Sequence, residues 1–287
     1  MTKVVALGGG HGLATSLRAA RRYADDITAI VSVADDGGSS GRLRQALGIE
    51  APGDLRRCLV ALANDERSVL ARAFEHRFEA GELEGHALGN ILIAGLASAT
   101  GDFRAALYEA GRLLDAVGRV LPATTGPVVL KGEAASGPVE GQVNVAEAGR
   151  LSAVSLVPPD AEAPPEALAA IAEADQVILG PGSLFTSVLA VTVVPAIRDA
   201  LQKTAAQKVY VCNLRPQDPE TTGYDTAAHV AALMAHGVEP DVGLGDPDGD
   251  VAAGEVPIRW VDRPLARPDG LAHDPGKLAQ ALRELLP

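Results

Sequence analysis

The stretch from Lys3 to Leu13 constrains the fold most, because an apolar run near the N-terminus ends in four glycines within five residues. A buried strand that ends in glycine and continues as a helix exposes backbone N–H groups at the turn. Glycine lets those groups approach an anion closely, since it has no side chain in the way. The pattern therefore predicts a strand, a phosphate-binding turn and a helix at the start of an α/β fold.

Two common nucleotide-binding motifs do not fit this turn. The dinucleotide fingerprint G-x-G-x-x-G would place Leu13 or Thr15 at its third glycine, and neither residue can serve there. The turn also lacks the lysine of a Walker P-loop. A glycine-rich turn of unassigned specificity remains, and a tight turn without a ligand is the alternative.

The composition limits the class of partner. The chain has 287 residues, 47% of them apolar, and a formal charge of −12 with a pI near 4.9. A negative protein does not bind nucleic acid or anionic membranes nonspecifically, because both need positive surface. We therefore expect an anion to be held locally, by glycine amides and a few arginines.

Other features favour a cytoplasmic protein. The best candidate for a membrane span, Ile91 to Ala99, is far shorter than the roughly 20 residues that a span needs, and no secretory signal fits the N-terminus. The two cysteines, Cys58 and Cys212, lie in apolar patterns that are typical of reduced, buried thiols. A disulfide or a metal pair is the alternative for them.

Alternating strand and helix patterns predict an α/β fold with a Rossmann-like, mostly parallel sheet flanked by helices. We expect residues 1–287 to form one domain. The period changes at about residues 124–148, where Val128 to Leu130 and Val139 to Val145 predict a small antiparallel hairpin insertion. The strand pattern from Leu151 to Val157 is expected to resume the parallel sheet.

A second polar loop follows the second predicted strand, Ile27 to Val33. Asp35 and Asp36 are placed to accept hydrogen bonds from a ribose or to hold Mg²⁺, because ligands bind beyond the carboxyl ends of strands in such sheets. Ser39 and Ser40 offer hydroxyls to an anion, and Arg42 offers a fork of donors. Ordinary turn and helix-cap chemistry is the alternative for this loop.

Two further strand ends and one helix start also carry glycines or polar residues that are suited to a ligand. The segment from Leu179 to Ser187 is a glycine-rich turn that predicts a second anion site. Asn213 follows another strand and is suited to a base or ribose, and Tyr224 is suited to stacking or to packing. Asn90 begins an apolar helix, where it either caps the helix or meets a ligand.

Taken together, these motifs resemble the YvcK family, the gluconeogenesis factors, which are similar in fold to the transferase CofD. The resemblance follows the chain in order and rests on six segments. They are Gly8 to Gly12, Ala34 to Arg44, Pro52 to Arg56, Gly85 to Asn90, Leu179 to Ser187 and Val211 to Asn213.

The resemblance implies a cytoplasmic regulator that binds UDP-sugars, notably UDP-N-acetylglucosamine, and supports cell shape and peptidoglycan supply on gluconeogenic carbon. It implies a diphosphate on the loops after two strands, with the nucleoside and sugar nearby, and no catalytic residue. The candidate ligand-binding residues are Gly9, Gly10, His11, Gly12, Leu13, Asp35, Asp36, Ser39, Ser40, Arg42, Asn90, Gly180, Gly182, Ser183, Thr186, Asn213 and Tyr224.

A rival reading is a CofD-like transferase of phosphoryl groups, in which Asp35 or Asp36 binds Mg²⁺. The resemblance implies a UDP-sugar ligand, and only the transferase reading adds a magnesium ion. A homo-oligomer and regulatory protein partners are alternatives that the sequence leaves open. The absence of the G-x-G-x-x-G fingerprint disfavours an NAD-dependent dehydrogenase. One segment, Arg215 to Glu220, departs from the family pattern because it is richer in proline, and two single positions depart as well. His11 stands where threonine is common, and Ala272 stands where arginine is common before a His-Asp pair.

Overall fold

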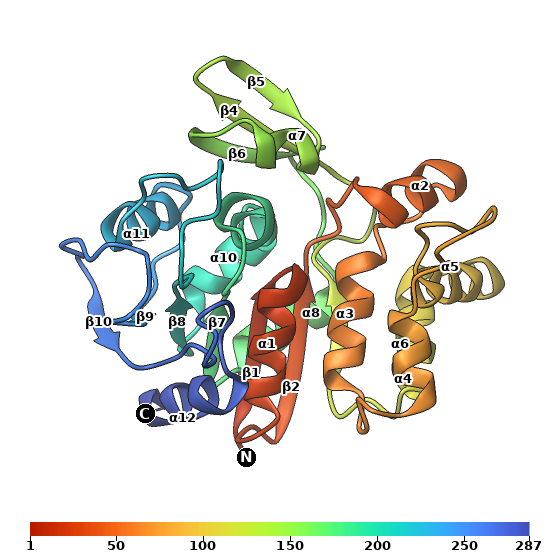
Figure 1. Cartoon of the computed structure of the whole chain (residues 1–287), viewed down its shortest axis with the longest axis horizontal. Coiled ribbons are helices and arrows are strands. Elements are labelled where there is room, and N and C mark those ends of the chain that lie inside the picture. Colours follow the sequence, from red (N-terminus) through yellow and green to blue (C-terminus); the bar gives the residue numbers. More distant parts are fainter. Residues whose placement is uncertain (287) are drawn as a thin grey trace.

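Seven parallel strands form the central sheet of the computed structural model, which describes residues 1–286 (Figure 1). Their order across the sheet is β10-β9-β8-β7-β1-β2-β3, so the chain progresses outward in both directions from β1 and β7. The topological switch point therefore lies between these two strands. The strands are β1 (Lys3–Gly8), β2 (Asp26–Val31), β3 (Arg119–Pro122), β7 (Gln176–Leu179), β8 (Gln207–Val211), β9 (Val242–Gly245) and β10 (Arg259–Asp262).

Helices cover both faces of this sheet. Helix α1 (Gly10–Ala20) lies in front of β1 and β2 and packs between α3 (Gly53–Leu62) and α12 (Pro275–Leu285), while α8 (Pro165–Glu173) lies behind (Figure 1). The predicted Rossmann-like architecture is confirmed. The remaining helices are α2 (Gly38–Leu47), α4 (Val69–Glu75), α5 (Leu88–Thr100), α6 (Phe103–Leu113), α9 (Ala190–Thr192), α10 (Pro195–Lys203) and α11 (Thr226–Ala235), with a π-helical segment η1 (Leu184–Leu189).

The core explains why the inner strands read as continuous apolar runs. All four residues of β7 are buried, as are five of the six residues of β1. A parallel strand with helices on both faces has no solvent-facing side, so it carries little alternation. Leu13 and Leu17 of α1 are fully buried against this core.

A small antiparallel sheet stands above the carboxyl edge of the large one (Figure 1). Strands β4 (Val129–Ala134) and β5 (Gly137–Glu140) form the predicted hairpin. Two expectations were wrong. Strand β6 (Leu151–Val157) pairs antiparallel with β4 instead of rejoining the parallel sheet. The second strand of the hairpin, predicted from Val139 to Val145, ends at Glu140 and is followed by helix α7 (Gln142–Glu147). Alternating burial along β6 fits a strand with one solvated face.

The short strands β3 and β9 have no counterpart in the sequence prediction. Strand β9 reads Val-Gly-Leu-Gly, and its glycines allow the ring of Trp260 on β10 to lie where a Cβ at Gly243 would be only 2.1 Å away. Glycine in a strand weakens the propensity signal. Among residues 1–286 no single helix is long and apolar enough to cross a membrane, although the bent pair Leu184–Thr192 and Pro195–Lys203 together meets that length and composition.

Candidate functional site

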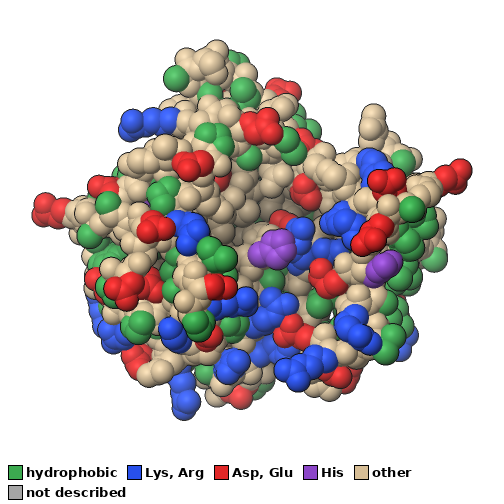
Figure 2. Space-filling view, viewed as in Figure 1, with side chains coloured by type: hydrophobic (Ala, Val, Ile, Leu, Met, Phe, Trp, Pro, Cys, Tyr) green, Lys and Arg blue, Asp and Glu red, His purple; other side chains and the backbone are tan. Residues whose placement is uncertain are grey.

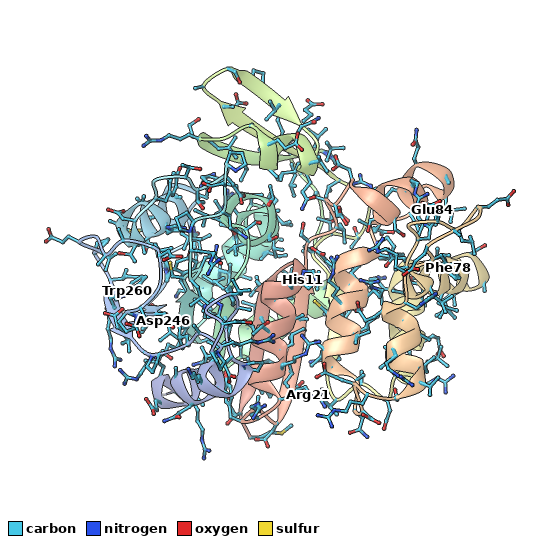
Figure 3. The ribbon with its side chains drawn as sticks, in the orientation of Figure 1. His11, Arg21, Phe78, Glu84, Asp246 and Trp260 are labelled. Carbon is cyan, nitrogen blue, oxygen red and sulfur yellow. The ribbon has the colours of Figure 1, made fainter. Side chains whose placement is uncertain are left out.

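A cleft of about 460 Å³ opens at the carboxyl edge of the large sheet. Figure 2 shows basic side chains and a histidine gathered beside the hollow at the centre of the molecule, and Figure 3 labels His11 there, at the start of α1. Most of the lining comes from the loops after β1, β2 and β7 and from the start of α3, and single residues come from α5, α7 and the segments after α4 and β8. It comprises Gly9, Gly10, His11, Gly12, Asp35, Gly37, Gly38, Ser39, Ser40, Gly53, Asp54, Arg56, Arg57, Arg77, Asn90, Gln142, Gly182, Ser183, Ser187 and Gln217.

The glycine loops after β1 and β7 touch one another across the switch point. A Cβ on Gly12 would lie 2.1 Å from the carbonyl oxygen of Pro181, so glycine is required for this approach. Gly10 has a φ of +64°, the left-handed conformation that favours glycine. The amide side chain of Asn213 holds the second loop, since it accepts from the Gly182 N–H at 3.0 Å and donates to the Gly182 carbonyl at 2.9 Å.

Three helices begin at the cleft, and their first turns are rich in glycine. The N-cap residues of α1, α2 and α3 are Gly9, Gly37 and Pro52, and within residues 1–286 none of the three makes a side-chain cap hydrogen bond. The first N–H groups of a helix have no carbonyl partner within it, and the helix dipole is positive there. The Gly53 N–H already donates to Ser40 Oγ at 3.1 Å and the Gly10 N–H bonds to the Asp54 carboxylate, so an anionic ligand would use the remaining N–H groups of these three ends.

A buried acidic group lies among these helix starts. The Asp54 carboxylate accepts from Arg57 at 2.7 Å and lies so near Gly9 that a Cβ there would be 2.5 Å from it. Burial raises the pKa of Asp54, and the charge of Asp35 adds to this, while Arg57 and the Gly10 amide oppose it. Burial and the Arg57 guanidinium lower the pKa of His11, which favours a neutral imidazole.

A polar network occupies the α2 and α5 side of the cleft. The Ser39 hydroxyl lies 3.0 Å from His86 Nδ1 and accepts from Asn90 Nδ2 at 3.1 Å. Asn90 is 2% exposed, and its Oδ1 has no hydrogen-bond partner among the described residues. Burial lowers the pKa of His86, with Arg42 and Arg77 contributing, so this ring favours the neutral form.

A side hollow of about 300 Å³ adjoins the cleft and shares His11, Gly12, Gly182 and Gln217 with it. Asn213, Arg215 and Ala272 line it, so both positions that depart from the family pattern, His11 and Ala272, lie here. His273 also lines it, with Nε2 3.2 Å from the Cys212 carbonyl oxygen. Burial lowers the pKa of His273 to about 4.

Ten of the predicted residues therefore meet in the cleft, and Asn213 lines the side hollow. The other six lie elsewhere. The Leu13 side chain is buried in the core, and the Gly180 carbonyl accepts from Ser16 at 2.6 Å. Arg42 donates to the Glu84 carbonyl at 2.7 Å, and Tyr224 packs edge-on against Phe185 and His229.

Two of these six residues are engaged by other parts of the chain. Asp36 accepts from the Val143 amide at 3.0 Å and so ties the loop after β2 to α7. The Thr186 amide donates to Glu220 at 2.9 Å, as does the Phe185 amide. A carboxylate of the protein thus already occupies the N–H groups at the start of η1.

The cleft also contains residues that the sequence did not single out as ligand-binding. Asp54 and Arg56 belong to the Pro52 to Arg56 segment of the family motif, which was a usable signal, and Arg57 follows directly. Ser187 ends the Leu179 to Ser187 segment of the same motif, whereas Arg77, Gln142 and Gln217 carried no signal of their own. For a magnesium ion, Asp35 lines the cleft together with Asp54, whereas Asp36 does not. No three His, Cys, Asp or Glu side chains in the described chain are grouped to hold a metal ion.

Comparison with known proteins gives a consistent relationship. The family profile described as 2-phospho-L-lactate transferase CofD matches residues 4–257. A gluconeogenesis factor of Halalkalibacterium halodurans is 46% identical over 86% of this chain and 79% of its own length. The gluconeogenesis factor of Bacillus subtilis is 46% identical over 82% of this chain and 74% of its own length.

Solved structures agree with this relationship. A crystal structure of a member of the UPF0052 family from Bacillus halodurans superposes with a TM-score of 0.92 at 38% identity, and covers 98% of both chains. A second structure of a protein from that organism gives a TM-score of 0.93 at the same identity, over 98% of this chain and 99% of the other.

Proposed function

Because this chain belongs to the CofD family and, within it, to the gluconeogenesis factors, we propose that it is a cytoplasmic regulator that binds a UDP-sugar without converting it. The ligand we propose is UDP-N-acetylglucosamine or a close analogue. In this role the protein reports nucleotide-sugar supply during growth on gluconeogenic carbon, and so supports peptidoglycan synthesis and cell shape.

One observation carries the proposal, namely the contact of two glycine loops at the switch point of the sheet. The first turn of α1 supplies N–H groups without partners in the helix, and Gly12 lets Pro181 and Gly182 approach it. A diphosphate suits this position because it brings two negative charges to a helix N-terminus. The side hollow is the space for the nucleoside, and the cleft, with Ser39 and Asn90, is the space for the sugar.

Calorimetric titration with UDP-N-acetylglucosamine, with and without Mg²⁺, tests the proposal, with NAD and GDP as controls. Saturable binding and recovery of the intact ligand are expected. Asn213→Ala removes both hydrogen bonds between this side chain and Gly182 in the loop after β7. The variant is expected to weaken binding about 10-fold or more, because hydrogen bonds from this loop to the charged diphosphate depend on where the loop lies. The matched control is Asn64→Ala, since Asn64 is an exposed residue bonded to Asp115, and unchanged affinity is expected.

A magnesium-dependent CofD-like transferase is a second candidate, favoured by the presence of both Asp35 and Asp54 in the cleft. Magnesium is commonly held by one or two carboxylates together with substrate phosphates. When bound, the ion would neutralise charge on a phosphoryl group as it passes to a hydroxyl acceptor. Mg²⁺-dependent cleavage of the nucleotide, lost in Asp54→Asn, would support this candidate and contradict the regulator.

A further inference from the structure

Three arginines form one wall of the cleft, at the junction of α3 with the segment after α4. Arg56, Arg57 and Arg77 make up this arginine wall. The charged residues that line the cleft are these three cations and two carboxylates, Asp35 and Asp54, so the lining is net positive in a chain of charge −12. The excess of positive side chains in the cleft is therefore a local feature that the overall charge of the chain does not explain.

Arg56 is buried to an unusual degree for a cation that is weakly paired. It is 2% exposed, its guanidinium lies 3.5 Å from the half-exposed Glu75, and its bond to the Phe74 carbonyl is long at 3.4 Å. Its Nε has no hydrogen-bond partner in the described part of the chain. A buried guanidinium with unmet donors is costly unless a further acceptor satisfies it.

Arg57 and Arg77 extend the same surface. Arg57 donates to Asp54 through one nitrogen, and its buried Nε is without a partner among residues 1–286. Arg77 is exposed and donates to the Gly85 carbonyl. His11 and His86, the two histidines beside the wall, both have lowered pKa values and so add no charge near neutral pH.

We propose that the arginine wall binds a second oxyanion, a carboxylate or phosphate group, beyond the diphosphate that the glycine loops hold. Guanidinium groups suit this role because they donate two parallel bonds to planar or tetrahedral oxyanions. The oxyanion is either the acidic end of the nucleotide-linked ligand or a separate small anion. The inference rests on the proposed function for the first anion, while the arginine wall itself is independent of it.

A matched pair of ligands tests the first source. UDP-glucuronic acid differs from UDP-glucose by a carboxylate in place of a hydroxymethyl group, and calorimetry gives the affinity ratio of the two. The second source is tested by titrating inorganic phosphate into protein that is saturated with UDP. We expect either about 10-fold tighter binding of the acidic sugar, or saturable phosphate binding to the UDP complex.

The variant Arg77→Gln separates this role from general binding. Because Arg77 is exposed, the variant is expected to fold, which thermal unfolding checks, and the affinity ratio or the phosphate binding is expected to fall at least five-fold. Arg72→Gln on α4 is the control, since Arg72 is also exposed but does not line the cleft, and it should behave as wild type.

Equal affinities for the two sugars together with no phosphate binding would overturn the inference. Phosphate binding or a sugar preference that Arg77→Gln leaves unchanged would overturn it as well, because the anion would then lie elsewhere. If UDP and its sugars fail to bind while phosphate binds in an Arg77-dependent way, the proposed function fails and the oxyanion subsite stands.

Discussion

Replacing Gly12 with alanine is predicted to force the two glycine loops apart. The added methyl group would lie 2.1 Å from the Pro181 carbonyl oxygen and 2.6 Å from its carbon. Both atoms belong to the backbone of the loop after β7, so no side-chain rotation relieves the overlap. Non-bonded heavy atoms are in ordinary contact at about 3.5 Å, and the loops must therefore separate by roughly 1.4 Å.

The expected size of the effect follows from this separation. Forcing an extra methyl group into packed structure costs about 1–3 kcal/mol of unfolding free energy. The shift also moves the first N–H groups of α1 away from the proposed diphosphate. A hydrogen bond to a charged group contributes about 1.5–3 kcal/mol, so loss of one such bond weakens nucleotide binding by about 10- to 100-fold.

Urea titration measures the first effect and calorimetry with UDP-N-acetylglucosamine measures the second. Gly95→Ala is the matched control, because Gly95 is exposed in α5 and a Cβ there would meet nothing within 4 Å. This control should gain about 0.5–1 kcal/mol in unfolding free energy and keep its affinity. A Gly12→Ala protein with wild-type stability and wild-type affinity would refute the described contact between the loops.

Three further predictions concern buried polar groups. Glu220→Ala should lower the free energy of unfolding by about 1–3 kcal/mol for each of the Phe185 and Thr186 amides that it leaves without an acceptor. Glu220→Gln keeps one acceptor oxygen and should lower it less. Urea titration of both variants measures the difference. Since burial lowers the pKa of His273 from 6.5 to about 4, the unfolded chain binds a proton that the folded chain does not, and wild type should lose up to about 3 kcal/mol relative to His273→Gln as the pH falls from 6.5 to 4. An equal pH dependence of the two proteins would contradict the burial of this ring. Burial raises the pKa of Cys58 well above its usual value and that of Cys212 to about 12, so a thiol reagent at pH 8 should modify neither cysteine in the folded protein and both after unfolding.

Local patterns predicted the parts of the site that depend on a few consecutive residues. The glycine turn after β1 and the loops after β2 and β7 lie at the carboxyl edge as expected, because strand ends and glycines are visible within a dozen residues. Leu13 belongs to the same segment, but its side chain faces the core with Leu17 because of the helical period. The Lys3 to Leu13 pattern therefore predicted the backbone of the turn correctly but did not predict where the Leu13 side chain lies.

Long-range contacts set the limits of the sequence prediction. Asp54, to which Arg57 donates, reaches the Gly9 turn from a helix more than forty residues away. Glu220 accepts from the Phe185 and Thr186 amides, and it lies in a loop about 35 residues further along the chain. Asp36 sits next to Asp35 in sequence but turns to α7, which a sequence pattern cannot distinguish. Strand β6 joins the small sheet through its antiparallel pairing with β4, and its own residue pattern does not show which sheet it joins or in which direction it runs.

A crystal structure of the complex with UDP-N-acetylglucosamine tests the central claim most directly. Electron density for the diphosphate is predicted against Gly9 to Gly12, where α1 begins beside Pro181, with the intact sugar in the cleft and the uridine in the side hollow. Density at another surface, or a cleaved nucleotide in the cleft, would contradict the account.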